Sequence, residues 1–147
     1  MNLRLKAAIA HGLTPIFCMG ETRQEREAAQ TEALLLRQVR QGLDGVPWNG
    51  DCLIAYEPVW AIGTSLAATG AQANEAIGYI RGLVVELFGP AIADATRILY
   101  GGSVKADNAA EFFSQPEIDG ALVGGASLDP DAFAAIVRAA ADAKTRA

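Results

Sequence analysis

Short continuous runs of apolar residues punctuate the chain and alternate with longer segments of helical spacing. Four runs have the length of a strand, and they cover residues 14–19, 52–56, 97–100 and 120–123. A strand of a parallel sheet that helices cover on its faces is apolar throughout, whereas a half-exposed strand alternates apolar and polar positions. The runs therefore predict an α/β fold, with a parallel sheet of four successive strand–helix units.

Helix signals fill the segments between these runs. Residues 1–10 carry the end of a helix that closes at His11, where the helix dipole favours an imidazole. Thr22 and Glu25 have the spacing of a capping box, which predicts the start of the next helix. We expect a buried stripe along that helix, made of Ala28, Leu35, Val39 and Leu43.

The later helices also begin at capping residues. These are Thr69 with Gln72, then Asp107, and finally Asp129 with Pro130. The helix that starts after Thr69 is expected to end at residues 89–90, which are Gly-Pro. The last helix is expected to bury Phe133, Ile136, Val137 and Ala140.

Composition limits the classes of partner and site. The chain has 147 residues, of which 51% are hydrophobic, and it contains no linker-like tract, so residues 1–147 are predicted to form one domain. A net charge of −5 disfavours nucleic acid, and no apolar run has the length of a membrane span. Cys18 and Cys52 lie in apolar runs, as buried thiols do, which favours the cytoplasm. One histidine and two separated cysteines cannot form a zinc site, and we expect neither metal nor cofactor.

The most informative residue is a carboxylate at the end of the second apolar run. Glu57 follows that run directly, and Pro58 then prevents the strand from continuing. Trp60 lies two positions further on, followed by a run of mostly small residues from Ala61 to Thr69. A partly desolvated carboxylate beside a hinge and a loop is typical of a proton-transfer site with a lid, although a salt-bridged structural glutamate is the alternative.

Two glycine pairs follow the third and fourth runs. Gly101-Gly102 precedes Ser103, and Gly124-Gly125 follows Val123. Glycines allow close approach of a ligand to backbone N–H groups, so two such turns at neighbouring strand ends predict an anion-binding site. Lys105 lies close by in the sequence, and we interpret it as a solvated surface lysine.

These motifs resemble the signature blocks of the triosephosphate isomerase family. The matching blocks are residues 15–22, 55–64, 100–104 and 119–128, in order along nearly the whole chain. The resemblance implies a half of a (β/α)8 barrel and the interconversion of dihydroxyacetone phosphate and glyceraldehyde 3-phosphate, a step of glycolysis and gluconeogenesis. Glu57 would be the base. The phosphate would be held by Gly63, Ser103, Gly124 and Gly125, and Ile62 and Leu122 would cover the carboxylate. Pro58, Trp60 and Tyr100 would serve the lid, with Tyr100 holding it near Ala68.

The chain also departs from the family pattern. A full barrel has eight units and about 250 residues, whereas this chain has four, which match the C-terminal half. The family's lysine and histidine electrophiles belong to the other half, and no residue here replaces them. Ser65 and Leu66 stand where the family has Gly-Lys, and Gly70 stands where it has proline.

Four parallel strands leave two open edges, which predicts an association. The chain is expected either to pair with itself, as a homodimer or higher oligomer, or to need a complementary N-terminal half. Alone, it is expected to have very weak isomerase activity or none. The alternative is a non-catalytic, phosphate-binding or self-assembling half-barrel module. A different phosphate-binding barrel enzyme, such as an epimerase, is disfavoured by the Glu-Pro-Val-Trp motif at residues 57–60.

Overall fold

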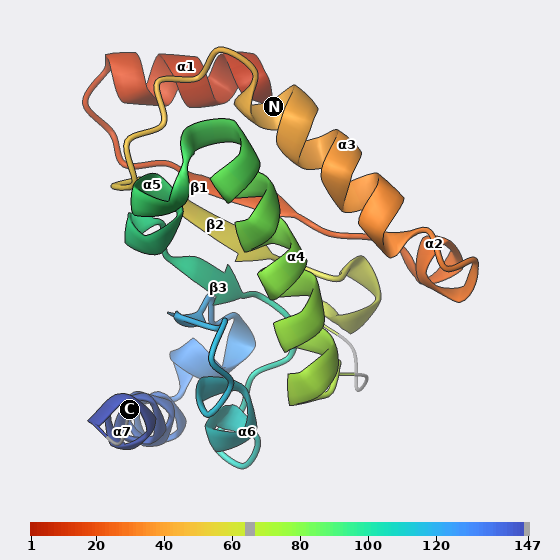
Figure 1. Ribbon diagram of the computed structural model, residues 1–147. Coiled ribbons are helices and arrows are strands. Elements are labelled where there is room, and N and C mark those ends of the chain that lie inside the picture. The colour runs from red at the N-terminus through yellow and green to blue at the C-terminus, as the bar shows by residue number, and fades with distance from the viewer. Residues whose placement is uncertain (64–66, 146–147) are drawn as a thin grey trace.

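The four apolar runs form one parallel sheet with the strands in sequence order (Figure 1). The computed structural model describes residues 1–63 and 67–145. Its strands are β1 (Ile16–Met19), β2 (Leu53–Tyr56), β3 (Ile98–Tyr100) and β4 (Gly120–Ala121). The last strand is shorter than predicted, although the Leu122 amide still donates to Tyr100 O at 2.9 Å. The predicted α/β fold with a parallel sheet is confirmed.

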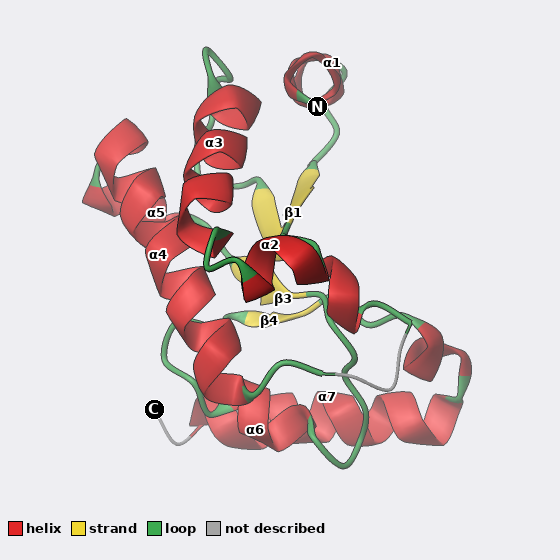
Figure 2. Cartoon of the chain, turned by 90° about the vertical axis from the view of Figure 1, so that its right-hand side faces the viewer, coloured by secondary structure: helices red, strands yellow, loops and turns green. Residues whose placement is uncertain are grey.

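Helices cover one face of this sheet and flank both of its edges. The longer helices are α1 (Asn2–Ala10), α3 (Thr31–Leu43), α4 (Gly70–Phe88) and α7 (Pro130–Thr145). The shorter ones are α2 (Arg23–Glu27), α5 (Pro90–Ala95), α6 (Ala109–Phe113) and the 3₁₀ turns η1 (Val59–Ala61) and η2 (Gly125–Leu128). Figure 2 shows α3 and α4 side by side against the sheet, with α1 beyond β1 and α7 beyond β4. No helix within residues 1–63 and 67–145 combines the length and apolarity needed to span a membrane.

The helix predicted after Thr22 is in fact two helices. The Thr22–Glu25 capping box is present, but α2 ends at Glu27, and α3 begins at Thr31. Ala29 between them has φ of +54°, a left-handed conformation that terminates a helix. The prediction that Ala28 is buried is therefore wrong, because it lies exposed at this break. The rest of the stripe is buried as predicted, together with Leu34.

Two further cap predictions have opposite outcomes. The Thr69–Gln72 capping box is present, and α4 ends before Gly89, as predicted. Asp107 does not cap α6, because Asn108 occupies the cap position and its side chain bonds the preceding turn instead. Asparagine can both donate and accept through its amide, so it suits a turn in which N–H and C=O groups need partners.

The last helix is less buried than predicted. Asp129 Oδ1 accepts hydrogen bonds from the Asp131 and Ala132 amides, so the cap itself is present. Ile136 is only 2% exposed, but Phe133 is 40% and Val137 52% exposed. Their prediction as buried is wrong because α7 lies at one end of the sheet, with no further element of the described chain beyond it (Figure 1).

Candidate functional site

Glu57 lies directly after β2, between the ends of two glycine-bearing strands. Its amide donates to Met19 O at 2.6 Å, which extends the pairing of β2 with β1. A Cβ at Gly101 would lie 2.5 Å from Glu57 Cγ, and one at Gly20 would lie 2.0 Å from Glu57 O. Glycine is therefore required on both sides of Glu57, because any side chain there would displace the carboxylate or its backbone.

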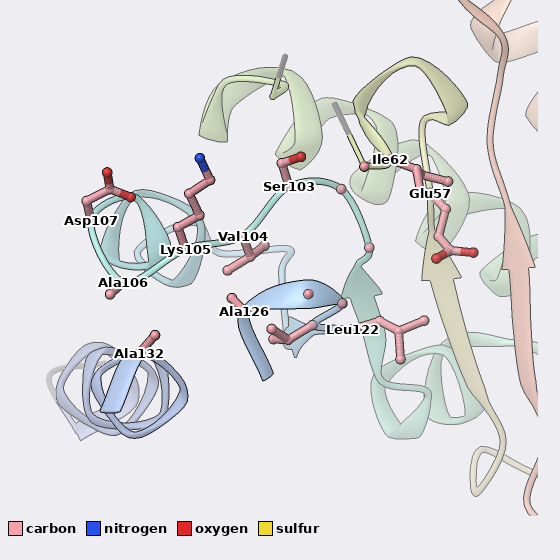
Figure 3. Close-up of a pocket in the computed structure, with 16 residues that line it drawn as sticks. Glu57, Ile62, Ser103, Val104, Lys105, Ala106, Asp107, Leu122, Ala126 and Ala132 are labelled. Carbon is pink, nitrogen blue, oxygen red and sulfur yellow. The ribbon is translucent and has the colours of Figure 1, made fainter. Parts of the chain in front are cut away.

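The carboxylate and both diglycine turns line one pocket. The pocket has a volume of about 740 Å³ and lies at the C-terminal ends of β2, β3 and β4. The seven residues that were expected to act as base, phosphate ligands or apolar cover all line it, namely Glu57, Ile62, Gly63, Ser103, Leu122, Gly124 and Gly125. Figure 3 shows Glu57 at one end and Asp107 with Ala132 at the other. The pocket thus brings together a carboxylate, apolar side chains and glycines from three strand ends.

The turn after β3 is held in place by an asparagine that sequence reasoning missed. Asn108 Oδ1 accepts from the Lys105 amide at 2.7 Å, and Asn108 Nδ2 donates to Ser103 O at 3.1 Å. Ser103 Oγ donates to Ala61 O at 2.8 Å. Lys105 is exposed, as predicted, but it also lines the pocket, on the same side of the turn as Ser103 (Figure 3). Lys105 is the only cationic side chain among the described lining residues.

A buried carboxylate that is not among the pocket residues was also missed. Glu21 is 0% exposed and accepts hydrogen bonds from Tyr56 Oη at 3.0 Å and Trp60 Nε1 at 3.1 Å. Arg26 Nη1 lies 3.2 Å from the same carboxylate, and its guanidinium stacks over the Trp60 ring at 5.0 Å. Burial, and then the negative charge of Glu21, raise the pKa of Tyr56, so the phenol remains a donor. The sequence signal that could have identified Glu21 is its charge, two positions after the end of the first apolar run.

The residues assigned to the lid lie outside the pocket lining, around the segment that follows Glu57. Pro58 is buried, and Trp60 is bound to Glu21 as described above. Tyr100 Oη accepts from the Ala68 amide at 3.2 Å, and the Tyr100 ring stacks on Phe112 with centroids 4.3 Å apart. The Gly70 amide donates to Glu111 Oε1 at 2.5 Å. Thr64, Ser65 and Leu66 lie outside the described residues.

The reactivity of the Cys18 thiol depends on the nearby Glu57 carboxylate. Burial, and then hydrogen bonding and charge from Glu57, raise the pKa of the Cys18 thiol to about 11. Because the thiolate is the reactive form, we expect Cys18 to react with iodoacetamide at pH 8 about 100-fold more slowly than a free cysteine. Glu57→Gln should accelerate that reaction by removing the negative charge beside the thiol, and mass spectrometry of the Cys18 peptide measures the rate. Equal rates in both proteins would show that the two side chains do not interact.

His11 has the helix-end position expected of it. It caps α1 through its backbone N–H, which donates to Ala7 O and Ala8 O. It does not belong to the pocket lining. Among the described residues, no group of three or more His, Cys, Asp or Glu side chains could hold a metal ion.

Comparison with known proteins gives one family. The family model described as triosephosphate isomerase matches residues 1–140. The triosephosphate isomerase of Pelodictyon phaeoclathratiforme is 54% identical over 140 residues, covering 95% of this chain and 56% of the relative. That of Chlorobium chlorochromatii is 56% identical over 141 residues, covering 96% and 56%. That of Symbiobacterium thermophilum is 50% identical over 148 residues, covering 99% and 58%.

The chain spans little more than half the length of the curated relatives that it matches. Together with four parallel strand–helix units, this makes the fold half of a (β/α)8 barrel. The glycine-flanked glutamate and the two diglycine turns lie within the matched residues. This chain belongs to the triosephosphate isomerase family.

Proposed function

We propose that the chain supplies the base and the phosphate-binding part of a triosephosphate isomerase. The single observation that supports this most is that Glu57 and both diglycine turns line one pocket. In the proposed reaction Glu57 takes a proton from the carbon next to the substrate carbonyl. It returns that proton to the neighbouring carbon of the enediolate, while the substrate's hydroxyl proton passes to the former carbonyl oxygen, so that ketose and aldose interconvert. Ile62 and Leu122 would exclude water from the carboxylate and so strengthen it as a base.

The phosphate of the triose would lie at the glycine turns. The N–H groups of Gly124 and Gly125, with Gly63 and Ser103, are proposed to bind it. An added Cβ at Gly124 or Gly125 would meet no atom within 4 Å, so open space surrounds both glycines. Pro58, Trp60 and Tyr100 are proposed to hold the two ends of the segment after Glu57. Both cysteines are free thiols, which agrees with the proposed cytoplasmic location.

Anion binding can be tested on the chain as it stands, independently of turnover. We expect Gly125→Glu to weaken binding of 2-phosphoglycolate about tenfold or more, because a second negative charge would face the bound phosphate. Isothermal titration calorimetry or chemical-shift titration at fixed ionic strength measures the affinity. The open space around Gly125 means that the larger side chain needs no repacking of the protein.

Gly82→Glu is the matched control. Gly82 is an exposed glycine of α4, its added Cβ would also meet nothing within 4 Å, and it is not a pocket residue. The same change of charge there should leave the affinity within about twofold, because exposed charges at a distance are screened by salt. Equal weakening by both variants would contradict a phosphate site at the glycine turns.

The second proposal is a non-catalytic, phosphate-binding half-barrel module. It is favoured by a pocket whose described lining follows three strand ends and includes Ala132 of α7, with no further strand contributing. In either case the open strand edges need a partner, and both a second copy and a complementary half were expected from the sequence. We expect the isolated chain to show very weak isomerase turnover or none. A coupled assay that gave turnover like that of a full-length relative would contradict this.

A further inference from the structure

The charged side chains in the described lining of the pocket do not balance. Glu57 and Asp107 are negative, and Lys105 is positive. Figure 3 shows Glu57 and Asp107 at opposite ends of the pocket, with the turn that bears Ser103 and Lys105 between them. An anion that binds here is therefore repelled from both ends, and its binding depends on the groups in between.

Backbone N–H groups at the glycine turns can supply only part of the attraction. They bind an anion through hydrogen bonds and partial charges, but they bring no full countercharge. A phosphate monoester carries about −1.5 to −2 charges near pH 7. Held by neutral donors alone, it would add this charge to a pocket that already has more negative than positive side chains. Hydrogen bonds from a charged donor are about twice as strong as those between neutral groups, so a cation beside the turns would strengthen the site.

The backbone of Lys105 is fully bonded within its own turn. Its amide donates to Asn108 Oδ1 at 2.7 Å, and its carbonyl accepts from the Asn108 and Ala109 amides at 3.3 and 3.0 Å. Asn108 Nδ2 also donates to Ser103 O at 3.1 Å, which closes the turn. Because both backbone groups of Lys105 are used in this way, its ammonium is the group that can reach a ligand.

The Lys105 side chain is placed to meet an anion in the pocket. It is exposed, and it lies on the same side of the turn as the Ser103 hydroxyl (Figure 3). None of the ion pairs found between described residues includes it. A lysine ammonium is a compact charge on a flexible four-carbon stem, so it can follow a ligand without a fixed geometry.

We propose that Lys105 supplies the countercharge for the phosphate of the ligand. The inference rests on the proposed function, because this phosphate is the one assigned to Gly124 and Gly125. Lys105 is exposed, as the sequence predicted, and it gains a binding role in addition. Asp107 acts in the opposite direction, because its carboxylate also lines the pocket and repels the ligand.

Affinity for 2-phosphoglycolate at two ionic strengths tests the charge directly. At about 20 mM we expect Lys105→Met to weaken binding about tenfold, because methionine keeps much of the side-chain length but removes the charge. At about 500 mM the same substitution should cost less than about threefold, because salt screens an exposed charge. Lys105→Arg should stay within about threefold of the unmodified chain, since it keeps the charge. Isothermal titration calorimetry measures the affinities, and circular dichroism checks that the variants keep their fold.

Lys6→Met is the matched control. It removes the same charge from α1, and Lys6 is not a pocket residue. Its affinity should stay within about twofold of that of the unmodified chain at both ionic strengths, because the charge is distant from the ligand. Equal weakening by Lys105→Met and Lys6→Met would overturn the proposal. So would a loss that Lys105→Arg does not recover, or one that salt does not reduce.

Asp107→Asn should change the affinity in the opposite direction. Removal of a repelling charge from the pocket is expected to strengthen binding of 2-phosphoglycolate about twofold at low ionic strength. Asp107 is exposed and does not cap α6, so asparagine should fit without a change in the turn. Weaker binding by Asp107→Asn would contradict the proposal that the charges in the pocket set the affinity.

The inference and the proposed function fail in different ways. If Gly125→Glu weakens binding and Lys105→Met does not, the inference is overturned and the phosphate site at the glycine turns stands. If Lys105→Met weakens binding and Gly125→Glu does not, the lysine binds the anion, but the assignment of its phosphate to the glycine turns is refuted. A chain that binds no 2-phosphoglycolate at millimolar concentration would refute both.

Discussion

Glutamine in place of Glu57 is expected to lower isomerase turnover by about 1,000-fold when this chain is combined with a complementary N-terminal half. That factor lies in the usual range for loss of a general base. An amide has nearly the shape of the carboxylate but cannot accept the transferred proton. The pocket around it would keep its glycine-bound geometry, because Gly20 and Gly101 leave room for the same side-chain volume. A coupled assay at saturating substrate measures the turnover, and binding of 2-phosphoglycolate should stay within about threefold.

Two further variants separate the loss of the carboxylate from a change in its position. Glu57→Asp keeps the carboxylate but withdraws it by one methylene, and a displacement of about 1 Å typically costs about 100-fold in rate. Glu86→Gln removes an exposed carboxylate of α4 that pairs with Arg40 at 3.6 Å, and it should leave the rate unchanged. A Glu57→Gln complex that retained a tenth of the turnover would contradict the assignment of Glu57 as the base.

Removing the Glu21 carboxylate is expected to cost about 3–5 kcal/mol in the free energy of unfolding, the range for loss of one partner of a buried ion pair. Glu21→Ala would leave the Tyr56 hydroxyl, the Trp60 indole and the Arg26 guanidinium without their shared acceptor. Because an unsatisfied buried donor loses its hydration without compensation, this loss exceeds that of an ordinary hydrogen bond. Urea denaturation followed by circular dichroism measures it.

The surface pair of Arg23 with Glu27 provides the comparison. Its Nε–Oε1 distance is 2.7 Å, shorter than the 3.2 Å between Arg26 and Glu21, yet both of its side chains are more than 60% exposed. Glu27→Ala should therefore cost well under about 1 kcal/mol, since water screens exposed pairs. If Glu21→Ala cost no more than Glu27→Ala, the buried network would not be what holds Trp60 in place.

Helix caps and strands were predicted correctly wherever residues adjacent in the sequence decide the conformation. Both capping boxes satisfy their own backbone groups within four residues, and Asp129 does the same, so their sequence spacing predicted them. The parallel strands could be predicted because both faces of the sheet are apolar, which leaves continuous apolar runs in the sequence. Glu57 stood out because a carboxylate next to such a run is costly to bury without a function or a partner.

Other features depend on contacts far apart in the sequence. The break at Ala29 rests on a left-handed turn that alanine rarely adopts, so no local pattern announces it. Glu21 acquires its role from Tyr56 and Trp60, which lie 35 and 39 residues away. The exposure of Phe133 and Val137 depends on the absence of a neighbouring element, which helical spacing does not encode.

The amino-acid sequence by itself determined the order of strand–helix units, the strand-end position of Glu57 and the two glycine turns, because each rests on residues adjacent in the chain. Only the tertiary structure decided that Glu57 and these turns share one pocket and that Glu21 binds Trp60, which lies just after Glu57. It also decided that one face of the sheet is partly exposed. The physical reason is that burial and hydrogen bonding between distant segments exist only after the strands have paired.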